Sequence, residues 1–240
     1  MMLNRIKIFA DGASLPMLRE LINNPAIAGY TTNPTLMRKA GVTDYREFAR
    51  AALEIVGDKP ISFEVFADDF PEMERQARTI SSFGANVYVK LPITNTRRDS
   101  TLPLVHELSS SGVKINVTAL CTLEQVEKSA EALRGGAPSI VSVFAGRIAD
   151  TGRDPIPLMA EAVSLCKAAC QGSAAAIELL WASPRELLNL VQAQSVGCPI
   201  ITVTSDLLAK LPLLGNELDE VSLQTVQMFH RDAAVAGYAL

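Results

Sequence analysis

Eight short apolar runs, each followed by a stretch with apolar residues at helical spacing, constrain the fold of this chain most strongly. The predicted strands cover residues 6–10, 26–30, 61–66, 87–91, 114–119, 140–144, 175–180 and 199–203. Predicted helices lie between them, for example at 44–56, 71–83, 123–133 and 157–170. Strands that alternate with helices through short connections form parallel sheets. We therefore predict a single domain over residues 1–240, an α/β protein with the (β/α)8 barrel architecture of triosephosphate isomerase.

An open, doubly wound sheet is the alternative, but no glycine-rich dinucleotide-binding turn follows the first predicted strand. Residues typical of helix starts support the alternation, because Asp44, Asp69 and Thr122 each precede an amphipathic stretch. Ser183 before Pro184 gives the same signal after the seventh strand, so we predict a helix that starts there. Residues 217–240 form one more predicted helix, which we expect to cover the barrel or to contact a neighbouring subunit of a homo-oligomer.

Composition narrows the class of protein. Hydrophobic residues make up 48% of the chain and charged residues 20%, which is typical of a folded globular protein. The net charge is −4, and the longest cationic run is Arg97-Arg98, so nucleic acid is not an expected partner. No apolar run approaches the roughly 20 residues that span a membrane, and the first residues lack a signal-peptide core. We expect a cytoplasmic protein with no membrane partner.

The cysteines and histidines do not have the spacing of metal ligands. The two histidines are His106 and His230, and the four cysteines are Cys121, Cys166, Cys170 and Cys198. Cys166 and Cys170 can share a helix face, but the chain has too few histidines to complete a site around them. We expect thiols buried in the core, no metal and no cofactor.

Lys90, close to the end of the fourth predicted strand, is the most informative charged residue. Side chains alternate along a strand, so Lys90 shares a face with Tyr88, whereas Val87, Val89 and Leu91 share the other. A parallel strand is covered on both faces, and burial disfavours the charged form of an amine. A neutral amine can attack a carbonyl and form a Schiff base. The structural alternative is a lysine that reaches water from the strand end.

Polar side chains lie at the C-terminal ends of many predicted strands. They are Asp11, Thr31, Thr32, Asn33, Glu64, Lys90, Asn116, Thr118, Ser142, Arg147, Ser183 and Arg185. Within the third, fifth and sixth strands one face is uniformly aliphatic or aromatic, and the polar residues lie on the other face. The C-terminal ends of barrel strands meet at one mouth, where barrel enzymes place their catalytic residues. The pattern therefore predicts one polar site at this mouth.

The residue types at this mouth suit Schiff-base chemistry on a sugar phosphate. Lys90 supplies an amine, while Asp11 and Glu64 supply groups that can transfer protons. The guanidinium groups of Arg147 and Arg185, together with Ser183 and the predicted helix start beside it, suit a phosphate. A structural role is equally open for the two arginines, whose sequence neighbours include the potential ion-pair partners Asp150, Asp154 and Glu186.

At this point the chain resembles the transaldolase family, in which six separate motifs agree in order and spacing. The motifs are Thr31-Thr32-Asn33-Pro34-Thr35, Glu64-Val65, Val89-Lys90-Leu91-Pro92, Asn116-Val117-Thr118, Ser142-Val143-Phe144-Ala145-Gly146-Arg147 and Ala182-Ser183-Pro184-Arg185. The resemblance runs from Asp11 to about Asp206, nearly the whole chain. It implies a barrel of metal-free class I aldolases that transfer a dihydroxyacetone unit between sugar phosphates.

The resemblance also implies roles for individual residues. Lys90 would form the Schiff base, Asp11 would be the acid/base for the carbon–carbon bond, and Glu64 and Thr118 would act together through a water. The remaining residues would bind the substrate. The dihydroxyacetone hydroxyls would be bound by Asn33, Asn116 and Ser142, and the phosphate by Arg147, Ser183 and Arg185. Thr32 and Phe144 would lie beside them.

Two alternative functions remain open from the sequence. A sister branch of fructose-6-phosphate aldolases releases free dihydroxyacetone, but it carries a tyrosine at the position of Phe144 and lacks the glutamate that matches Glu64. A barrel that binds sugar phosphates without catalysis is the other alternative, and the presence of Asp11, Glu64, Lys90 and Thr118 together argues against it. The chain departs from the family pattern at positions where acceptor specificity would be set, namely Gly12, Thr35, Pro184 and the loop 94–99.

Overall fold

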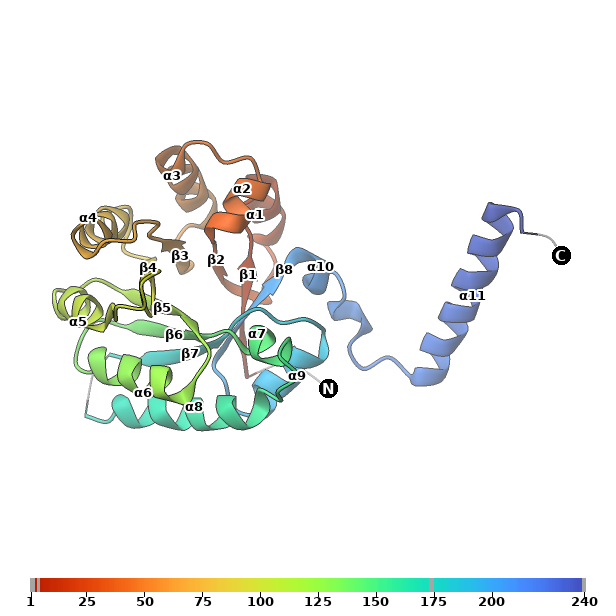
Figure 1. Ribbon diagram of the computed structural model, residues 1–240. Coiled ribbons are helices and arrows are strands. Elements are labelled where there is room, and N and C mark those ends of the chain that lie inside the picture. The colour runs from red at the N-terminus through yellow and green to blue at the C-terminus, as the bar shows by residue number, and fades with distance from the viewer. Residues whose placement is uncertain (1–2, 4, 173–174, 239–240) are drawn as a thin grey trace.

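A computed structural model describes residues 3, 5–172 and 175–238 of the chain. Eight parallel strands close into a barrel in chain order, which confirms the predicted (β/α)8 architecture (Figure 1). The strands are β1 (Lys7–Asp11), β2 (Ile27–Thr31), β3 (Ile61–Glu64), β4 (Val87–Pro92), β5 (Ile115–Leu120), β6 (Ser139–Val143), β7 (Ile177–Trp181) and β8 (Ile200–Thr204). Each end lies within two residues of the predicted one.

Helices cover the outside of the barrel between successive strands (Figure 1). They are α1 (Leu15–Leu21), α2 (Pro34–Lys39), α3 (Tyr45–Val56), α4 (Phe70–Ser81), α5 (Leu102–Ser110), α6 (Leu123–Ala132), α7 (Ala145–Ala149), α8 (Ile156–Ala169) and α9 (Leu188–Ser195). Two further helices, α10 (Ser205–Leu208) and α11 (Leu218–Ala236), follow the last strand. Three predicted caps are confirmed, because Asp44, Asp69 and Thr122 accept hydrogen bonds from the backbone three residues later. Such caps satisfy N–H groups that have no partner within the helix.

The predicted helix start at Ser183 is wrong, because α9 begins only at Leu188. Ser183 has a left-handed backbone with φ of 59°, which a helix start does not use. The side chain of Asn189 instead accepts hydrogen bonds from the backbone N–H groups of Arg185 (2.7 Å) and Glu186 (3.2 Å). These bonds satisfy the donors that a first helical turn would leave free, and they hold 183–187 as a loop.

Two apolar layers support the barrel. The larger lies between strands and helices and includes Val87, Val89 and Leu91, the predicted outer face of β4. A smaller cluster of Phe9, Ile140, Leu180, Ala182 and Ile200 packs with Tyr88, on the opposite strand faces. A Cβ atom at Gly29 would lie 2.7 Å from the Phe9 ring, so the absent side chain at this position makes room for that ring. The inner cluster therefore closes the barrel below the polar strand ends.

Helix α11 stands away from the barrel at the end of an extended segment (Figure 1). None of its residues is buried, so the expectation that it covers the barrel is wrong. Residues 239 and 240 of the predicted helix lie outside the described residues. Among the described helices, none is both long enough and apolar enough to span a bilayer.

Candidate active site

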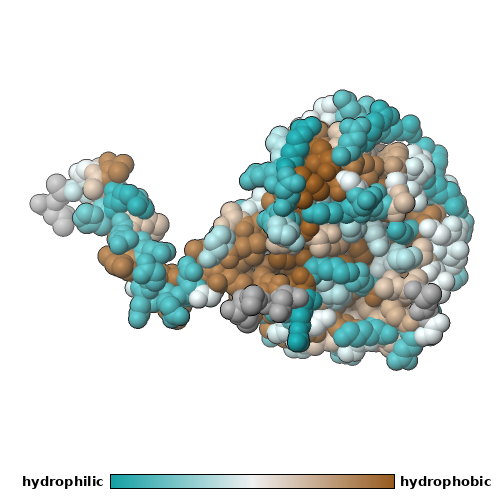
Figure 2. All heavy atoms as spheres, turned by 180° about the vertical axis from the view of Figure 1, so that it is seen from behind, coloured by the Kyte–Doolittle hydropathy of each residue, from teal (hydrophilic) through white to brown (hydrophobic). Residues whose placement is uncertain are grey.

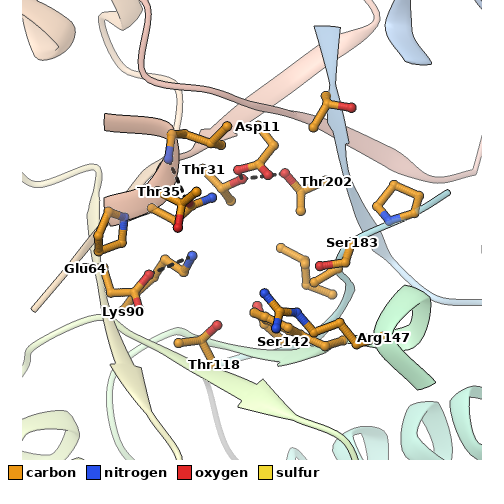
Figure 3. A pocket seen from close by; sticks show the side chains of 18 of the residues that line it. Asp11, Thr31, Thr35, Glu64, Lys90, Thr118, Ser142, Arg147, Ser183 and Thr202 are labelled. Carbon is orange, nitrogen blue, oxygen red and sulfur yellow. Dashed lines mark hydrogen bonds and ion pairs between the residues drawn. The ribbon is translucent and has the colours of Figure 1, made fainter. Parts of the chain in front are cut away.

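A cavity of about 550 Å³ opens at the C-terminal ends of the strands (Figure 3). Most of the predicted site residues line it: Asp11, Asn33, Glu64, Lys90, Thr118, Ser142, Phe144, Arg147, Ser183 and Arg185. Thr32 and Asn116 are fully buried and lie outside its lining. Side chains from at least seven strands or the loops that follow them thus converge on one polar pocket.

Lys90 lies at one wall of this cavity, and its side chain is 8% exposed. The Nζ atom donates a hydrogen bond to the backbone oxygen of Thr32 at 3.0 Å and lies 3.2 Å from Oε2 of Glu64. The Glu64 carboxylate thus adjoins the buried amine. The register explains the contact, since β3 and β4 place Glu64 directly beside Lys90. An amine and a carboxylate at this distance can exchange a proton.

Glu64 and Thr118 flank Lys90 on neighbouring strands. The Tyr45 hydroxyl donates to the backbone oxygen of Glu64 at 2.8 Å and so fixes the end of β3. Thr118 Oγ1 is buried and has no hydrogen-bond partner within the described part of the chain. Its neighbour Ala119 has a left-handed backbone with φ of 67°, at an irregularity in the pairing of β5 with β6. Such strain in a non-glycine residue is common at functional sites.

Asp11 is held at the end of β1 by hydroxyl groups. The Thr31 hydroxyl donates to Asp11 Oδ1 at 2.8 Å, and the Thr202 hydroxyl contacts that of Thr31 in turn (Figure 3). Burial raises the pKa of Asp11 above its ordinary value, although the positive charge of Lys90 and the Thr31 bond lower it. A carboxyl group with a raised pKa is suited to both accepting and returning a proton.

A buried hydrogen-bond network lies behind the pocket wall. The Ser142 hydroxyl donates to Asn116 Oδ1 at 2.6 Å, and Asn116 Nδ2 donates to Ser62 Oγ at 3.1 Å. The Thr32 hydroxyl donates to the backbone oxygen of Ser62 at 2.9 Å. Asn116 thus positions Ser142, which faces the cavity, and the backbone oxygen of Thr32 positions Lys90.

The two predicted phosphate-binding arginines have different surroundings. Arg185 donates from Nε to Asp150 at 2.9 Å and from a terminal nitrogen to the Ser183 backbone oxygen at 3.0 Å. A second terminal nitrogen also contacts Asp150, so the pair is bidentate and the predicted competition from this carboxylate occurs. Arg147 lies over the ring of Phe144, with the guanidinium carbon 5.3 Å from the ring centroid.

Close backbone packing brings Arg147 and Arg185 to the same side of the cavity. A Cβ atom at Gly146 would lie 1.5 Å from the backbone oxygen of Ser183, so only glycine fits there. The N–H group of Gly146 also donates to the oxygen of Ala182 at 3.3 Å. The first turn of α7 therefore packs directly on the loop after β7.

Several residues that line the cavity are not among the predicted site residues. Thr202 and Thr204 of β8 face the pocket, and Lys39 lines it from α2. The two threonines alternate with Ile201 and Val203, so the period of two that marked the other strands was available as a signal. Nothing in the sequence around Lys39 distinguishes it from a surface lysine on a helix.

Asn33 serves the pocket and the local fold together. Its side-chain oxygen accepts a hydrogen bond from Leu36 N at 2.9 Å and caps α2, which leaves its amide group for the cavity.

The described residues contain no cluster of three or more His, Cys, Asp or Glu side chains placed to hold a metal ion. Cys166 and Cys198 are buried thiols as expected, and burial raises the pKa of each to about 12, whereas Cys121 is exposed.

The sequence of this chain matches a known protein family over almost its whole length. The model of the transaldolase/fructose-6-phosphate aldolase family matches residues 8–238. The chain belongs to this family. A probable transaldolase of Dehalococcoides mccartyi is 32% identical over 86% of this chain and 90% of its own length. A probable transaldolase of Methanococcus maripaludis strain C7 is 33% identical over 90% of this chain and 95% of its own length. A probable transaldolase of Chelativorans sp. strain BNC1 is 35% identical over 86% of this chain and 88% of its own length.

Solved structures support the fold independently of the family motifs. KGPDC from Streptococcus mutans superposes with a TM-score of 0.53 at 10% identity, covering 85% of this chain and 88% of its own. The flavin-binding domain of baker's yeast flavocytochrome b2 gives the same TM-score at 14% identity, covering 82% of this chain and 56% of its own. At such identities the likeness concerns the barrel alone.

Proposed function

We propose that this member of the transaldolase family transfers a dihydroxyacetone unit between sugar phosphates through a Schiff base on Lys90. One such reaction converts sedoheptulose 7-phosphate and glyceraldehyde 3-phosphate to erythrose 4-phosphate and fructose 6-phosphate. The observation that carries the proposal is the buried Lys90 amine, 3.2 Å from the Glu64 carboxylate at the wall of a polar cavity. The reaction needs neither metal nor cofactor, because the amine itself activates the carbonyl carbon.

The first half of the reaction forms the imine. The Lys90 amine attacks C2 of the ketose phosphate and gives a carbinolamine, which loses water to form the imine. Glu64 and Thr118 assist this loss, since the carboxylate adjoins the amine and the Thr118 hydroxyl has no other partner among the described residues. Ser142 and the amide group of Asn33 face the cavity and are suited to binding the sugar hydroxyls.

The second half cleaves and remakes the carbon–carbon bond. Asp11 removes the proton of the C4 hydroxyl, the C3–C4 bond breaks, and an aldose phosphate leaves while an enamine remains on Lys90. The enamine attacks the aldehyde of a second aldose phosphate, and Asp11 returns its proton to the new alkoxide. Water then hydrolyses the imine, which releases the new ketose phosphate and restores the Lys90 amine. Arg147, Ser183 and Arg185 hold the phosphate of both aldoses, since Arg147 and Ser183 lie on the same side of the cavity (Figure 3) and Arg185 contacts the backbone oxygen of Ser183.

Chemical trapping tests the proposal. Incubation with fructose 6-phosphate followed by borohydride should reduce the imine and leave a dihydroxyacetone-derived group on the peptide that contains Lys90. Peptide mass spectrometry locates the group, and Lys90→Met should abolish labelling. Lys114→Met is a matched control, because Lys114 also adjoins a barrel strand but its amine bonds to the Ala85 backbone oxygen outside the cavity. An unlabelled Lys90, or labelling that survives Lys90→Met, would remove the basis of the mechanism.

A further inference from the structure

The carboxyl group of Asp11 lies at one end of a chain of hydroxyl groups that two neighbouring strands supply. β1 pairs with β2 on one side and with β8 on the other. Thr31 lies directly beside Asp11 on β2, and Thr202 lies on β8 beside Phe9, two residues before Asp11 on β1. Both threonines are buried, and both line the cavity together with Asp11. Figure 3 shows the three side chains in contact along one wall of the pocket.

The single proton of each hydroxyl group sets the direction of donation along this chain. Thr31 Oγ1 donates its proton to Asp11 Oδ1 at 2.8 Å. The Thr31 oxygen can therefore only accept in its contact with the Thr202 hydroxyl, and Thr202 is the donor there. A hydroxyl group that accepts one hydrogen bond donates the other more strongly, because the two bonds polarise each other. Thr202 thus strengthens the bond from Thr31 to Asp11 and holds the Thr31 hydroxyl in its donating orientation.

The charged groups around Asp11 act from other strands. Lys90 on β4 lowers the pKa of Asp11 and Glu64 on β3 raises it. Neither β2 nor β8 carries a carboxylate or a cation. Helix α10 also lies beside β1, and its one ionisable group, Asp206, is exposed. The contribution of the neighbouring strands to the Asp11 carboxylate is therefore the hydroxyl chain, and the bond from Thr31 lowers the pKa of Asp11.

We propose that Thr202 is a positioning residue for the carbon–carbon bond step, and that it acts on Asp11 through Thr31. The proposal rests on the proposed function, in which Asp11 must be ionised to remove the proton of the C4 hydroxyl. Thr202 keeps Thr31 donating to Oδ1 of Asp11, which favours the carboxylate and leaves Oδ2 for the substrate.

Carbon-13 NMR of protein labelled at its aspartate carboxyl groups measures this effect without turnover. The Asp11 signal is assigned by its loss in Asp11→Asn, and its change with pH gives the pKa. Thr202→Val keeps a branched side chain but removes the hydroxyl, so it should raise the pKa of Asp11 by about half a pH unit, the equivalent of a weak hydrogen bond. Thr202→Ser is the matched control, because it keeps the hydroxyl, and it should leave the pKa unchanged. Thr202→Ala, which also lacks the hydroxyl, replaces Thr202→Val if that variant does not fold.

A double variant separates the path through Thr31 from a direct effect of Thr202 on Asp11. Thr31→Val should raise the pKa of Asp11 at least as much as Thr202→Val does, and Thr202→Val added to Thr31→Val should cause no further rise. A further rise would show that the apolar side chain acts on Asp11 directly, which would overturn the proposal. An unchanged pKa in Thr202→Val, or an equal rise in Thr202→Ser, would overturn it as well.

A single turnover of fructose 6-phosphate connects the hydroxyl chain to the reaction. Formation of glyceraldehyde 3-phosphate needs ionised Asp11, so the pH at which its rate is half-maximal should rise in Thr202→Val by the same amount as the pKa. Borohydride trapping of the imine on Lys90 should keep its pH dependence, because imine formation does not use Asp11. If trapping occurs but the pH dependence of cleavage does not move, Thr202 has no role in the bond step and the proposal is wrong. If Lys90 is not trapped in the unmodified protein, the proposed function fails, and the NMR titration still decides whether Thr202 acts on Asp11.

Discussion

At the scale of single residues, the pocket keeps two carboxyl groups in different surroundings. Glu64 lies beside the Lys90 amine, whereas Asp11 lies among hydroxyl groups at the end of β1. Burial outweighs the Lys90 charge at Asp11 and raises the pKa of its carboxyl group. Enzymes commonly assign different proton-transfer roles to two carboxyl groups by such differences in environment.

The raised pKa of Asp11 predicts a stability effect with a definite sign. The folded protein binds a proton at Asp11 more tightly than the unfolded chain, so the carboxyl group reduces stability as pH rises from 3.8 through its folded pKa. Asp11→Asn removes this loss. We therefore expect Asp11→Asn to have a higher Tm than the unmodified protein at pH 7, with the difference shrinking as the pH falls toward 3.8.

Differential scanning calorimetry across this pH range measures the effect, and turnover of fructose 6-phosphate with an aldose acceptor should be lost in the same variant. Thr35→Val is a suitable control, because Thr35 lines the pocket but carries no titratable group. An Asp11→Asn protein less stable than the unmodified one at pH 7 would mean that hydrogen bonding by the carboxylate outweighs the cost of burying it.

Phe144 predicts transfer rather than release of the dihydroxyacetone unit. Its ring lines the cavity beneath Arg147 and offers no hydroxyl that could assist hydrolysis of the enzyme-bound intermediate. We expect fructose 6-phosphate alone to give little steady release of dihydroxyacetone, and addition of erythrose 4-phosphate to give rapid turnover. Phe144→Tyr should raise the release rate about tenfold or more, which is less than the roughly hundredfold low end of the gain from a fully positioned acid or base.

An enzymatic assay for free dihydroxyacetone measures this balance, with and without the acceptor. Phe144→Leu serves as the control, because it also alters the side chain at this position but adds no hydroxyl. Rapid release by the unmodified protein, with no gain from acceptors, would make fructose-6-phosphate aldolase activity the better description.

At the scale of elements, the phosphate side of the pocket depends on the contact between α7 and the loop after β7. A Cβ atom at Gly146 would meet the backbone oxygen of Ser183 at 1.5 Å, and backbone cannot move aside as a side chain does. Gly146→Ala should therefore destabilise the fold by about 3 kcal/mol, the upper range for overpacking. Urea unfolding measures the change.

Gly12→Ala provides the comparison, because the added Cβ would meet only the flexible end of the Met17 side chain, 2.6 Å away. We expect that variant to lose markedly less stability than Gly146→Ala. Equal losses at the two positions would show that the loop after β7 can shift and that the close approach at Gly146 is not required.

The same elements show what the sequence could and could not predict. The positions of the strands and of Asp11, Glu64, Lys90 and Thr118 follow from local patterns, because barrel strands alternate inward and outward side chains. The loop after β7 does not follow, since Asn189 holds the backbone of Arg185 in place of a helical turn. The sequence indicates Asp150 as one of three possible ion-pair partners of the arginines, but Asp150 and Arg185 are 35 positions apart, and only the folded barrel shows that these two residues pair.

At the scale of the whole molecule, the barrel is complete without α11, which lies apart from it with its apolar side chains in water (Figure 1). Figure 2 shows apolar patches along the projecting helix and over the segment that joins it to the barrel. The exposed side chains include Val221, Met228 and Val235, seven residues apart, with Phe229 beside Met228 at 63% exposure. Seven-residue spacing places Val221, Met228 and Val235 along one face of the helix, and Phe229 lies about 100° around the axis from Met228, at the edge of that face.

A helix held only by its own hydrogen bonds is marginally stable in water, so this face needs a packing partner. We predict that the partner is a second copy of this chain and that the protein is a homo-oligomer. Phe229→Asp should convert it to the monomer, because a charge on a buried apolar face is strongly unfavourable. Gln227→Asp is the matched control, since Gln227 lies on the opposite side of α11 and is exposed. Analytical ultracentrifugation measures the change, and a monomeric unmodified protein at micromolar concentration would contradict the prediction.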